Sequence, residues 1–140
     1  MIRPYKGKFH CEWYKNTTSE TFTHNDLVYL SSGYLTKFAD SVDQPPLALI
    51  QRTIASTDEA YSTAETCPVL VGGPNAEYLC DVSTGTAAQS HVGTWIDVDD
   101  HNSVDVDAST YDIFFVTKII DSTADAGQVV AKMQSQDPYQ

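Results

Sequence analysis

Acidic side chains are the reactive groups that this chain concentrates most, and carboxylates can bind a metal ion. Segment 96–107 reads IDVDDHNSVDVD. A chain reversal at 100–102 would put its apolar residues on one face of a hairpin and four carboxylates on the other. The apolar residues are Ile96, Val98, Val104 and Val106, and the carboxylates are Asp97, Asp99, Asp105 and Asp107.

Carboxylates that face one another repel, and a calcium ion would relieve the repulsion because it prefers oxygen ligands. Segment 96–107 lacks the D-x-[DN]-x-[DN]-G spacing of an EF-hand loop, however, and no Glu stands at the required distance. An acidic face in water needs no ion, because dissolved salt screens its charges. We therefore expect a solvated acidic face, no metal and no cofactor, with calcium at these four Asp as the alternative.

Residues that could perform catalysis are scattered along the chain. The four histidines are isolated from one another, at positions 10, 24, 91 and 101. The serine-rich segments contain no G-x-S-x-G turn, and the glycines form neither a Walker loop nor a G-x-G-x-x-G motif. Because no nucleophile, base and orienting group cluster, we expect no enzymatic activity.

Two of the three cysteines flank a turn signal. The sequence GGPN at 72–75 stands at the centre of a symmetric apolar segment. A four-residue hairpin loop there would place six mainly apolar side chains on one sheet face. The expected pairs are Val71 with Ala76, Val69 with Tyr78 and Cys67 with Cys80. Because no export signal is visible, we expect two buried thiols, with a disulfide as the alternative.

Positive charge is concentrated at the N-terminus. Residues 1–15 carry four of the eight Lys and Arg against one Glu, a net charge of +3, whereas the rest of the chain carries −14. Large aromatic residues alternate with these cations. Charge of opposite sign steers contact with an acidic surface. We interpret 1–15 as an extended docking arm, with an ordinary edge strand as the alternative. Its candidate partner-binding residues are Arg3, Tyr5, Lys6, Lys8, Phe9 and Trp13.

Composition limits the classes of partner. A net charge of −11 argues against nucleic acid, which attracts a basic surface. No apolar run approaches the roughly 18 residues of a membrane span, and the basic N-terminus lacks the apolar centre of a signal peptide. We therefore expect a soluble protein that binds other proteins, with no membrane or nucleic-acid partner.

Short runs rich in Val, Ile, Thr and aromatic residues alternate with turn clusters, which predicts an all-β sandwich or barrel. The expected strands are 6–14, 20–23, 26–30, 34–38, 47–54, 68–71, 76–81, 92–98, 104–107, 112–120 and 128–133. The last two would form a closing hairpin. Segment 57–66 is a short helix or a loop. We expect the arm, 1–15, and one β-domain, 16–140, and no internal repeat. The alternative is two β-subdomains, 20–55 and 67–133, divided near 56–66.

Three segments together resemble the small decoration, or cement, proteins of tailed-phage capsids. They are FTHNDLVYLSSGYLTKFADS followed by LALIQRTIAS, the region 67–109, and the closing FFVTKIIDSTADAGQVVAKM. The resemblance covers about residues 20–133 and lies in the order of strands and turns. It implies a β-rich virion protein, made in the host cytoplasm, that binds the major capsid protein and stabilises the capsid surface. It also implies a dimer or trimer.

Two other classes of function stay open from the residues alone. One is a different virion component, such as a head-fibre base, a tail part or an adaptor. The other is a sugar- or calcium-binding β-module, in which Trp13 and Trp95 would stack on a ligand.

Overall fold

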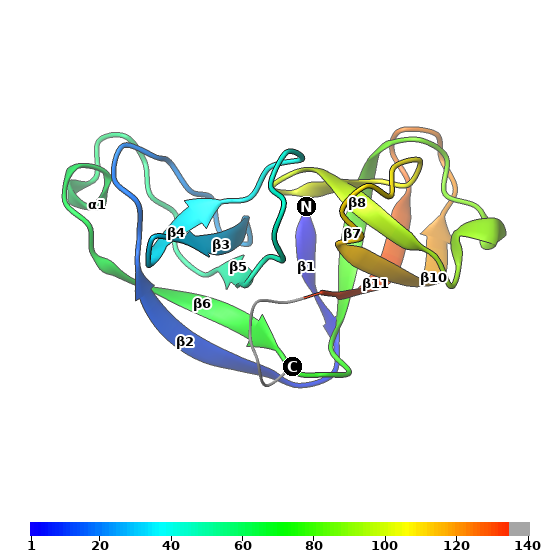
Figure 1. Ribbon diagram of the computed structural model, residues 1–140, viewed down its shortest axis with the longest axis horizontal. Coiled ribbons are helices and arrows are strands. Elements are labelled where there is room, and N and C mark those ends of the chain that lie inside the picture. The colour runs from blue at the N-terminus through cyan, green and yellow to red at the C-terminus, as the bar shows by residue number, and fades with distance from the viewer. Residues whose placement is uncertain (135–140) are drawn as a thin grey trace.

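The computed structural model describes residues 1–134 and shows a nearly all-β protein, as the sequence predicts (Figure 1). One turn of α-helix, α1 (Glu59–Ser62), and one 3₁₀ turn, η1 (Gln89–His91), are the helical elements of this part of the chain. The strands are β1 (Ile2–Lys6), β2 (Phe9–Lys15), β3 (Leu27–Ser31), β4 (Tyr34–Lys37), β5 (Ala48–Ile50), β6 (Thr66–Gly72), β7 (Glu77–Thr84), β8 (Trp95–Asp100), β9 (Ser103–Asp105), β10 (Phe114–Asp121) and β11 (Gln128–Met133).

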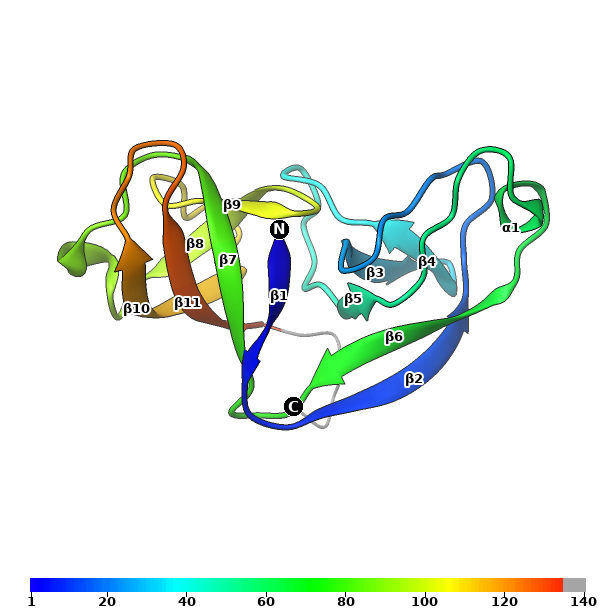
Figure 2. The same ribbon diagram turned by 180° about the vertical axis from the view of Figure 1, so that it is seen from behind.

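The strands form two sheets, and each sheet is the frame of one lobe (Figures 1 and 2). The first lobe contains the sheet β2-β6-β5-β3-β4. The second lobe contains the sheet β1-β7-β11-β10-β8-β9, which closes on itself because β9 also pairs with β7 in parallel. In the first lobe a parallel bridge between Asn16 and Leu35 brings β4 back to the end of β2.

The two lobes repeat one topology. Numbered from its own first strand, β2 or β7, each lobe has the strand order 1-5-4-2-3. Neighbours in this order are antiparallel, and strand 3 returns to strand 1 in parallel. Leu35 and Val104 make the equivalent closing contacts, to Asn16 and Val82. The expectation of no repeat was therefore wrong at the level of the fold, because this repetition lies in strand pairing and not in residue identity.

The boundary between the lobes differs from the one expected near 56–66. The α1 turn lies there, inside the first lobe. The chain instead crosses between the sheets at 7–8 and again at 73–76, since β1 pairs with β7 and β2 pairs with β6. The two crossings are adjacent, because the Gly73 N–H donates to the Lys8 carbonyl at 2.8 Å. The N-terminal residues thus belong to both lobes.

Each lobe has a hydrophobic core, and the lobes also pack against each other. Val28, Leu35 and Val69 are among the buried residues of the first core. The second core includes Tyr78 and Phe114, and residues of the first lobe join it. These residues are Leu27 in β3, Phe38 just after β4, and Leu49 in β5. The lobes are therefore held together by apolar contact as well as by the two crossings.

The hairpin expected for 67–80 was wrong. Strand β6 pairs with β2 and strand β7 pairs with β1, so the turn at 73–75 joins two different sheets. Cys67 lies in the core of the first lobe and Cys80 in that of the second, and the cysteines are free thiols. Burial raises the pKa of both Cys67 and Cys80, which keeps these thiols protonated.

Two predicted hairpins are confirmed. Strands β8 and β9 pair with Val98 opposite Val104, and the four apolar residues of segment 96–107 are buried in the second core. Strands β10 and β11 form the closing hairpin, with Phe114 opposite Met133. In both cases the two strands follow each other directly in the sequence, so a local turn connects them.

Candidate functional site: an exposed tryptophan face on β2 and β6

The N-terminal segment is an integral part of both sheets. Ile2 is fully buried and lies opposite Cys80 in the β1–β7 pair. Strand β2 pairs with β6 along its whole length, from Phe9 opposite Gly72 to Lys15 opposite Thr66. The expectation of an extended arm was therefore wrong, because alternate residues of 2–15 supply apolar surface and the backbone fills two sheet edges. The edge-strand alternative describes this segment.

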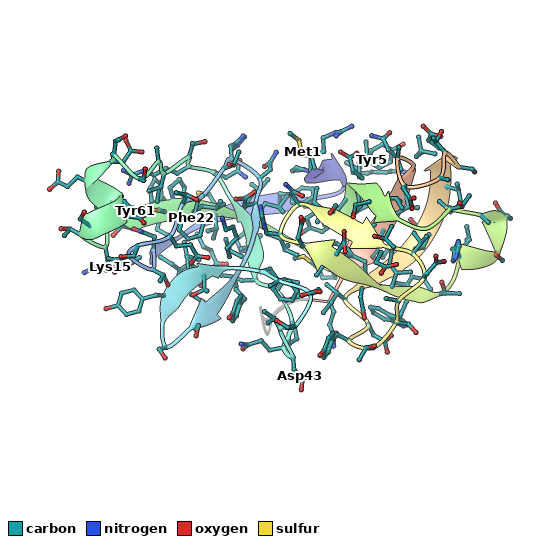
Figure 3. The ribbon with its side chains drawn as sticks, turned by 90° about the horizontal axis from the view of Figure 1, so that it is seen from above. Met1, Tyr5, Lys15, Phe22, Asp43 and Tyr61 are labelled. Atoms are coloured by element: carbon teal, nitrogen blue, oxygen red, sulfur yellow. The ribbon has the colours of Figure 1, made fainter. Side chains whose placement is uncertain are left out.

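The structure does not gather the six candidate binding residues into one cluster. Arg3, Tyr5 and Lys6 lie on β1 in the second lobe, and Lys8 lies at the crossing. Phe9 and Trp13 lie on β2 in the first lobe. Figure 3 shows the spread, with Tyr5 on the side of the second lobe and Lys15 at the outer end of the first, near Tyr61. The basic charge is thus distributed along the molecule.

One subset of these residues does form a surface. Odd-numbered residues of β2 point to one side of the sheet, and directly paired residues of β6 point to the same side. Trp13 is 62% exposed on this side and lies opposite Pro68. Exposed Cys11 lies opposite half-buried Leu70. We call Cys11, Trp13, Pro68 and Leu70 the tryptophan face.

The tryptophan face continues an apolar surface that the second lobe covers. Leu70 lies opposite Leu49, and Leu49 lies opposite Leu27, so these side chains share one side of the sheet. Leu27 and Leu49 are completely buried in the second core, whereas Trp13 and Cys11 are open to solvent. The tryptophan face is therefore the uncovered end of an apolar surface whose other end packs against the second lobe.

Polar side chains border the tryptophan face. Gln51 continues the row that contains Trp13 and Pro68, since its N–H donates to the Pro68 carbonyl at 2.9 Å. The Gln51 amide contacts Nε2 of His24 at 2.9 Å and donates to Oδ1 of Asn25 at 2.9 Å. An aromatic centre with a polar border is the usual composition of a protein-binding patch. Sequence reasoning identified Trp13 but missed Pro68, Leu70 and Gln51, because only strand pairing places them beside it.

Phe9 has a structural role in addition to its place on β2. Its ring makes an edge-to-face contact with Tyr78 at a centroid distance of 5.5 Å. Tyr78 is fully buried in the second core, so Phe9 connects the start of β2 to the other lobe. This contact fixes the end of β2 nearest the crossing, and Asn16 fixes the other end by its bridge to Leu35. The tryptophan face therefore lies between two ends of β2 that are both held by contacts.

A second exposed tryptophan lies on the other lobe, paired with the half-buried Phe115. Trp95 is 41% exposed and contacts Phe115 edge to face, with 5.4 Å between ring centroids. The two residues are opposite each other in the β8–β10 pair. This pair is far from β2 in the fold, on the sheet of the second lobe. It supplies a control surface for any test of Trp13.

The carboxylates of segment 96–107 take part in backbone and hydroxyl hydrogen bonds. Asp97 is only 4% exposed and accepts N–H donors from residues 110, 111 and 112 at 2.7–2.9 Å. Asp99 accepts the Ser83 hydroxyl at 2.6 Å, and Asp105 accepts the N–H of Asp107 at 2.9 Å. A fully solvated face was thus the wrong expectation, because the 108–112 loop covers Asp97. Within residues 1–134 no three His, Cys, Asp or Glu groups gather to hold a metal ion.

The described residues include no helix that is both long and apolar enough to cross a membrane. No family model, no curated protein and no solved structure matches this chain.

Proposed function

We propose that this protein is a non-enzymatic structural component of a phage virion, which binds the major capsid protein on the outer surface and stabilises the shell. The tryptophan face is the docking surface in this proposal. The single observation that carries it is the 62% exposure of Trp13 on a strand held at both ends, beside the apolar side chains of Pro68 and Leu70. The choice of the capsid as the partner rests on the resemblance of the sequence to decoration proteins.

Physical reasons favour docking at this face. Tryptophan dominates the energetics of protein interfaces because it buries a large area with few rotatable bonds. The surrounding protein has a net charge of −11, which keeps it soluble before assembly. Strand β2 itself carries one Glu and one Lys, so a partner approaching there meets little of the negative charge. Docking at Trp13 therefore combines apolar contact with weak repulsion.

The proposal is tested by rebinding to capsids. The purified protein is added to capsids of the phage that encodes it, prepared without this protein, and the bound fraction is measured by co-sedimentation. Trp13→Ala is expected to weaken binding by roughly 30-fold, the loss typical of one interface hot spot. Its melting temperature should stay nearly unchanged, because substitutions of exposed side chains alter stability by about 0.5 kcal/mol or less.

Trp95→Ala is the matched control, since it removes the other exposed tryptophan and leaves β2 intact. It should bind capsids as the native protein does. Equal binding by native protein and Trp13→Ala would show that the docking face lies elsewhere. Absence of binding by the native protein to expanded as well as immature capsids would contradict the capsid proposal itself.

A second candidate function is carbohydrate binding at Trp95. The observation that favours it is the partly exposed indole held by Phe115 on the second lobe. Sugars stack on such aromatic platforms. A glycan array with native protein and Trp95→Ala tests it. A glycan signal that Trp95→Ala removes would favour this function over capsid docking.

A further inference from the structure

Strand β2 is an edge of its sheet. In the described part of the chain its strand partner is β6, and the bridge from Asn16 to Leu35 engages the chain only after Lys15. Figures 1 and 2 both show β2 along the outer margin of the first lobe. Seven residues is long for an edge strand, and such an edge is a template for pairing with another chain.

The register shows which backbone groups line this edge. The Gly73 N–H donates to the Lys8 carbonyl at 2.8 Å, and the Asn16 N–H donates to the Glu65 carbonyl at 3.1 Å. Because hydrogen-bonded pairs alternate in an antiparallel ladder, the even-numbered residues of β2 bond to β6. The N–H and C=O groups of the odd-numbered residues therefore point to the outer edge. These residues are Phe9, Cys11, Trp13 and Lys15.

We propose that two copies of this protein pair through their β2 edges, antiparallel, with the two-fold axis at Cys11. Phe9 then lies opposite Trp13 of the second copy, and Cys11 lies opposite Cys11 of the second copy. All of these are edge-facing residues, so each pair exchanges two hydrogen bonds and the three pairs form about six. The two first-lobe sheets become one continuous sheet.

Side-chain complementarity selects this register. On the tryptophan face, Phe9 meets Trp13 of the second copy, and aromatic cross-strand pairs are favourable. On the opposite face, His10 meets Glu12 of the second copy. Within one chain Nε2 of His10 already lies 3.3 Å from Oε2 of Glu12, so pairing brings two imidazoles and two carboxylates together. Hydrogen bonds between directly facing polar side chains stabilise a strand pair.

Other registers with the same backbone hydrogen bonding are less complementary. An axis at Glu12 would place two carboxylates opposite each other, which is unfavourable. An axis at Trp13 would place Glu12 opposite Tyr14 and His10 opposite Asn16, and neither pair brings an imidazole to a carboxylate. An axis at His10 would pair only three residues of β2. The axis at Cys11 alone combines aromatic pairs with histidine–carboxylate pairs inside the strand.

The charge distribution also favours self-association at this edge. Each copy has a net charge of −11, so most surfaces repel a second copy. Strand β2 contains one Glu and one Lys, so the paired edges themselves add no net charge to this repulsion. The pairing leaves both tryptophan faces on the same side of the joined sheet, with their Trp13 Cα atoms about 14 Å apart. It does not depend on the proposed capsid docking.

Sedimentation of the purified full chain tests the proposal, with charge-exchange variants as the specific probe. We expect the native chain to form a dimer whose dissociation constant His10→Glu raises by about tenfold or more, because the introduced carboxylate then faces Glu12 of the second copy. The double variant His10→Glu, Glu12→Lys places opposite charges face to face and should restore the dimer. Cys11→Pro should also dissociate it, because the lost N–H faces the outer edge and not β6.

Oxidative cross-linking locates the axis. Directly facing Cα atoms in a hydrogen-bonded antiparallel pair lie about 5.5 Å apart, within the range that a disulfide spans. Copper phenanthroline should therefore link the native chain rapidly through exposed Cys11, since Cys67 and Cys80 are buried. Cys11→Ser should abolish the link. A thiol placed at exposed Tyr34 on β4, by Tyr34→Cys in the Cys11→Ser chain, should link far more slowly.

Several outcomes would overturn the proposal. One is a native chain that stays monomeric up to roughly 200 µM. Another is a dimer that persists in both His10→Glu and Cys11→Pro, because its interface would then lie elsewhere. The proposed register would be rejected if His10→Glu dissociated the dimer and the double variant did not restore it. A monomer that gains a strand from a different protein would show that the edge has another occupant. None of these measurements uses capsids, so their result is separate from the docking test.

Discussion

Oδ1 of Asp26 in the first lobe lies 3.7 Å from Nε2 of His101 in the second lobe. The backbone strengthens this connection, because the Leu27 N–H donates to the His101 carbonyl at 2.7 Å. Oδ2 of Asp26 accepts the Thr23 N–H at 2.8 Å. The tight turn between β8 and β9 is thus held against the start of β3, at a site where Asp26 is only 3% exposed.

The pH dependence of stability should report this buried carboxyl. Burial raises the pKa of Asp26 above its ordinary value of 3.8, although the Thr23 N–H and His101 oppose the shift. Between 3.8 and the raised pKa, the folded protein binds more protons at Asp26 than the unfolded chain. The contribution of Asp26 to the free energy of unfolding therefore falls as pH rises through the folded pKa.

Asp26→Asn removes this titration and keeps an oxygen acceptor for Thr23. Urea unfolding of both proteins, from about pH 7 to about pH 4, measures the difference in the free energy of unfolding. We expect the native protein to gain stability relative to Asp26→Asn as the pH is lowered. A difference that stays constant over this range, or that changes in the other direction, would contradict the raised pKa.

The crossing between the lobes should tolerate no side chain at Gly7. Its φ is +101°, and a Cβ there would lie 2.9 Å from Cα of Ala76 and 3.0 Å from the Asn75 carbonyl oxygen. We expect Gly7→Ala to lower the free energy of unfolding by roughly 2–4 kcal/mol, because it adds a backbone clash to an unfavourable backbone conformation. Urea unfolding measures the loss.

Gly33→Ala is the matched control for this variant. Gly33 has a φ of +84°, and no atom lies within 4 Å of the Cβ it would carry. Its loss should be only the conformational cost, about 1–2 kcal/mol. Equal losses at the two positions would mean that the contact between the crossings at Gly7 and Ala76 does not constrain the fold.

Local sequence patterns were enough to predict those parts of the fold that depend on neighbours in the chain. Alternation and a two-residue turn specify the β8–β9 hairpin, and Val98 and Val104 face each other as expected. Strands β10 and β11 also pair as expected, through the short connection 122–127. In each case the partner strand follows within a few residues, so the loop that must close is short.

Pairing between distant segments could not be predicted in this way. The GGPN turn is flanked by a symmetric apolar pattern. This pattern favours a hairpin as strongly as the patterns around the two turns that do form hairpins. The partners of β6 and β7 lie more than 50 residues earlier, in β2 and β1. The alternation of 68–71 and 76–81 fits either arrangement equally well, because both bury one face of each strand. Nothing local distinguishes a hairpin from a crossing.

The candidate site was predictable only in part for the same reason. Trp13 was identified from its residue type and from the basic charges around it. Pro68 and Leu70 lie beside it because β6 pairs with β2, a relationship that joins residues about 55 positions apart. The charge of residues 1–15 favours a docking arm, whereas their alternation favours a strand. Buried Ile2 shows that alternation is the stronger signal.

Asn16 is a buried polar residue whose importance the sequence did not indicate. Its side-chain amide donates to the carbonyls of Ala60 at 2.8 Å and Thr17 at 2.9 Å. Its Oδ1 accepts the Glu65 N–H at 2.9 Å. It occupies the closing position of the first lobe, where the second lobe has the apolar Val82. At this position one lobe thus has a hydrogen-bonded amide and the other an apolar side chain.

Replacing Asn16 by Val tests whether the amide is needed for closure. Asn16→Val leaves the Ala60 carbonyl and the Glu65 N–H buried without their partner, so we expect the free energy of unfolding to fall by about 3 kcal/mol. Thr17→Val is the control, because it removes one hydrogen bond, to the Thr36 hydroxyl at 2.9 Å, and should cost about 1 kcal/mol. If Asn16→Val were as stable as the native protein, an apolar side chain would be sufficient at the closing position of the first lobe, as Val82 is in the second. The shared strand order would then be enough to bring β4 back to the end of β2. The Asn16 amide would serve only to position α1, through its hydrogen bond to the Ala60 carbonyl.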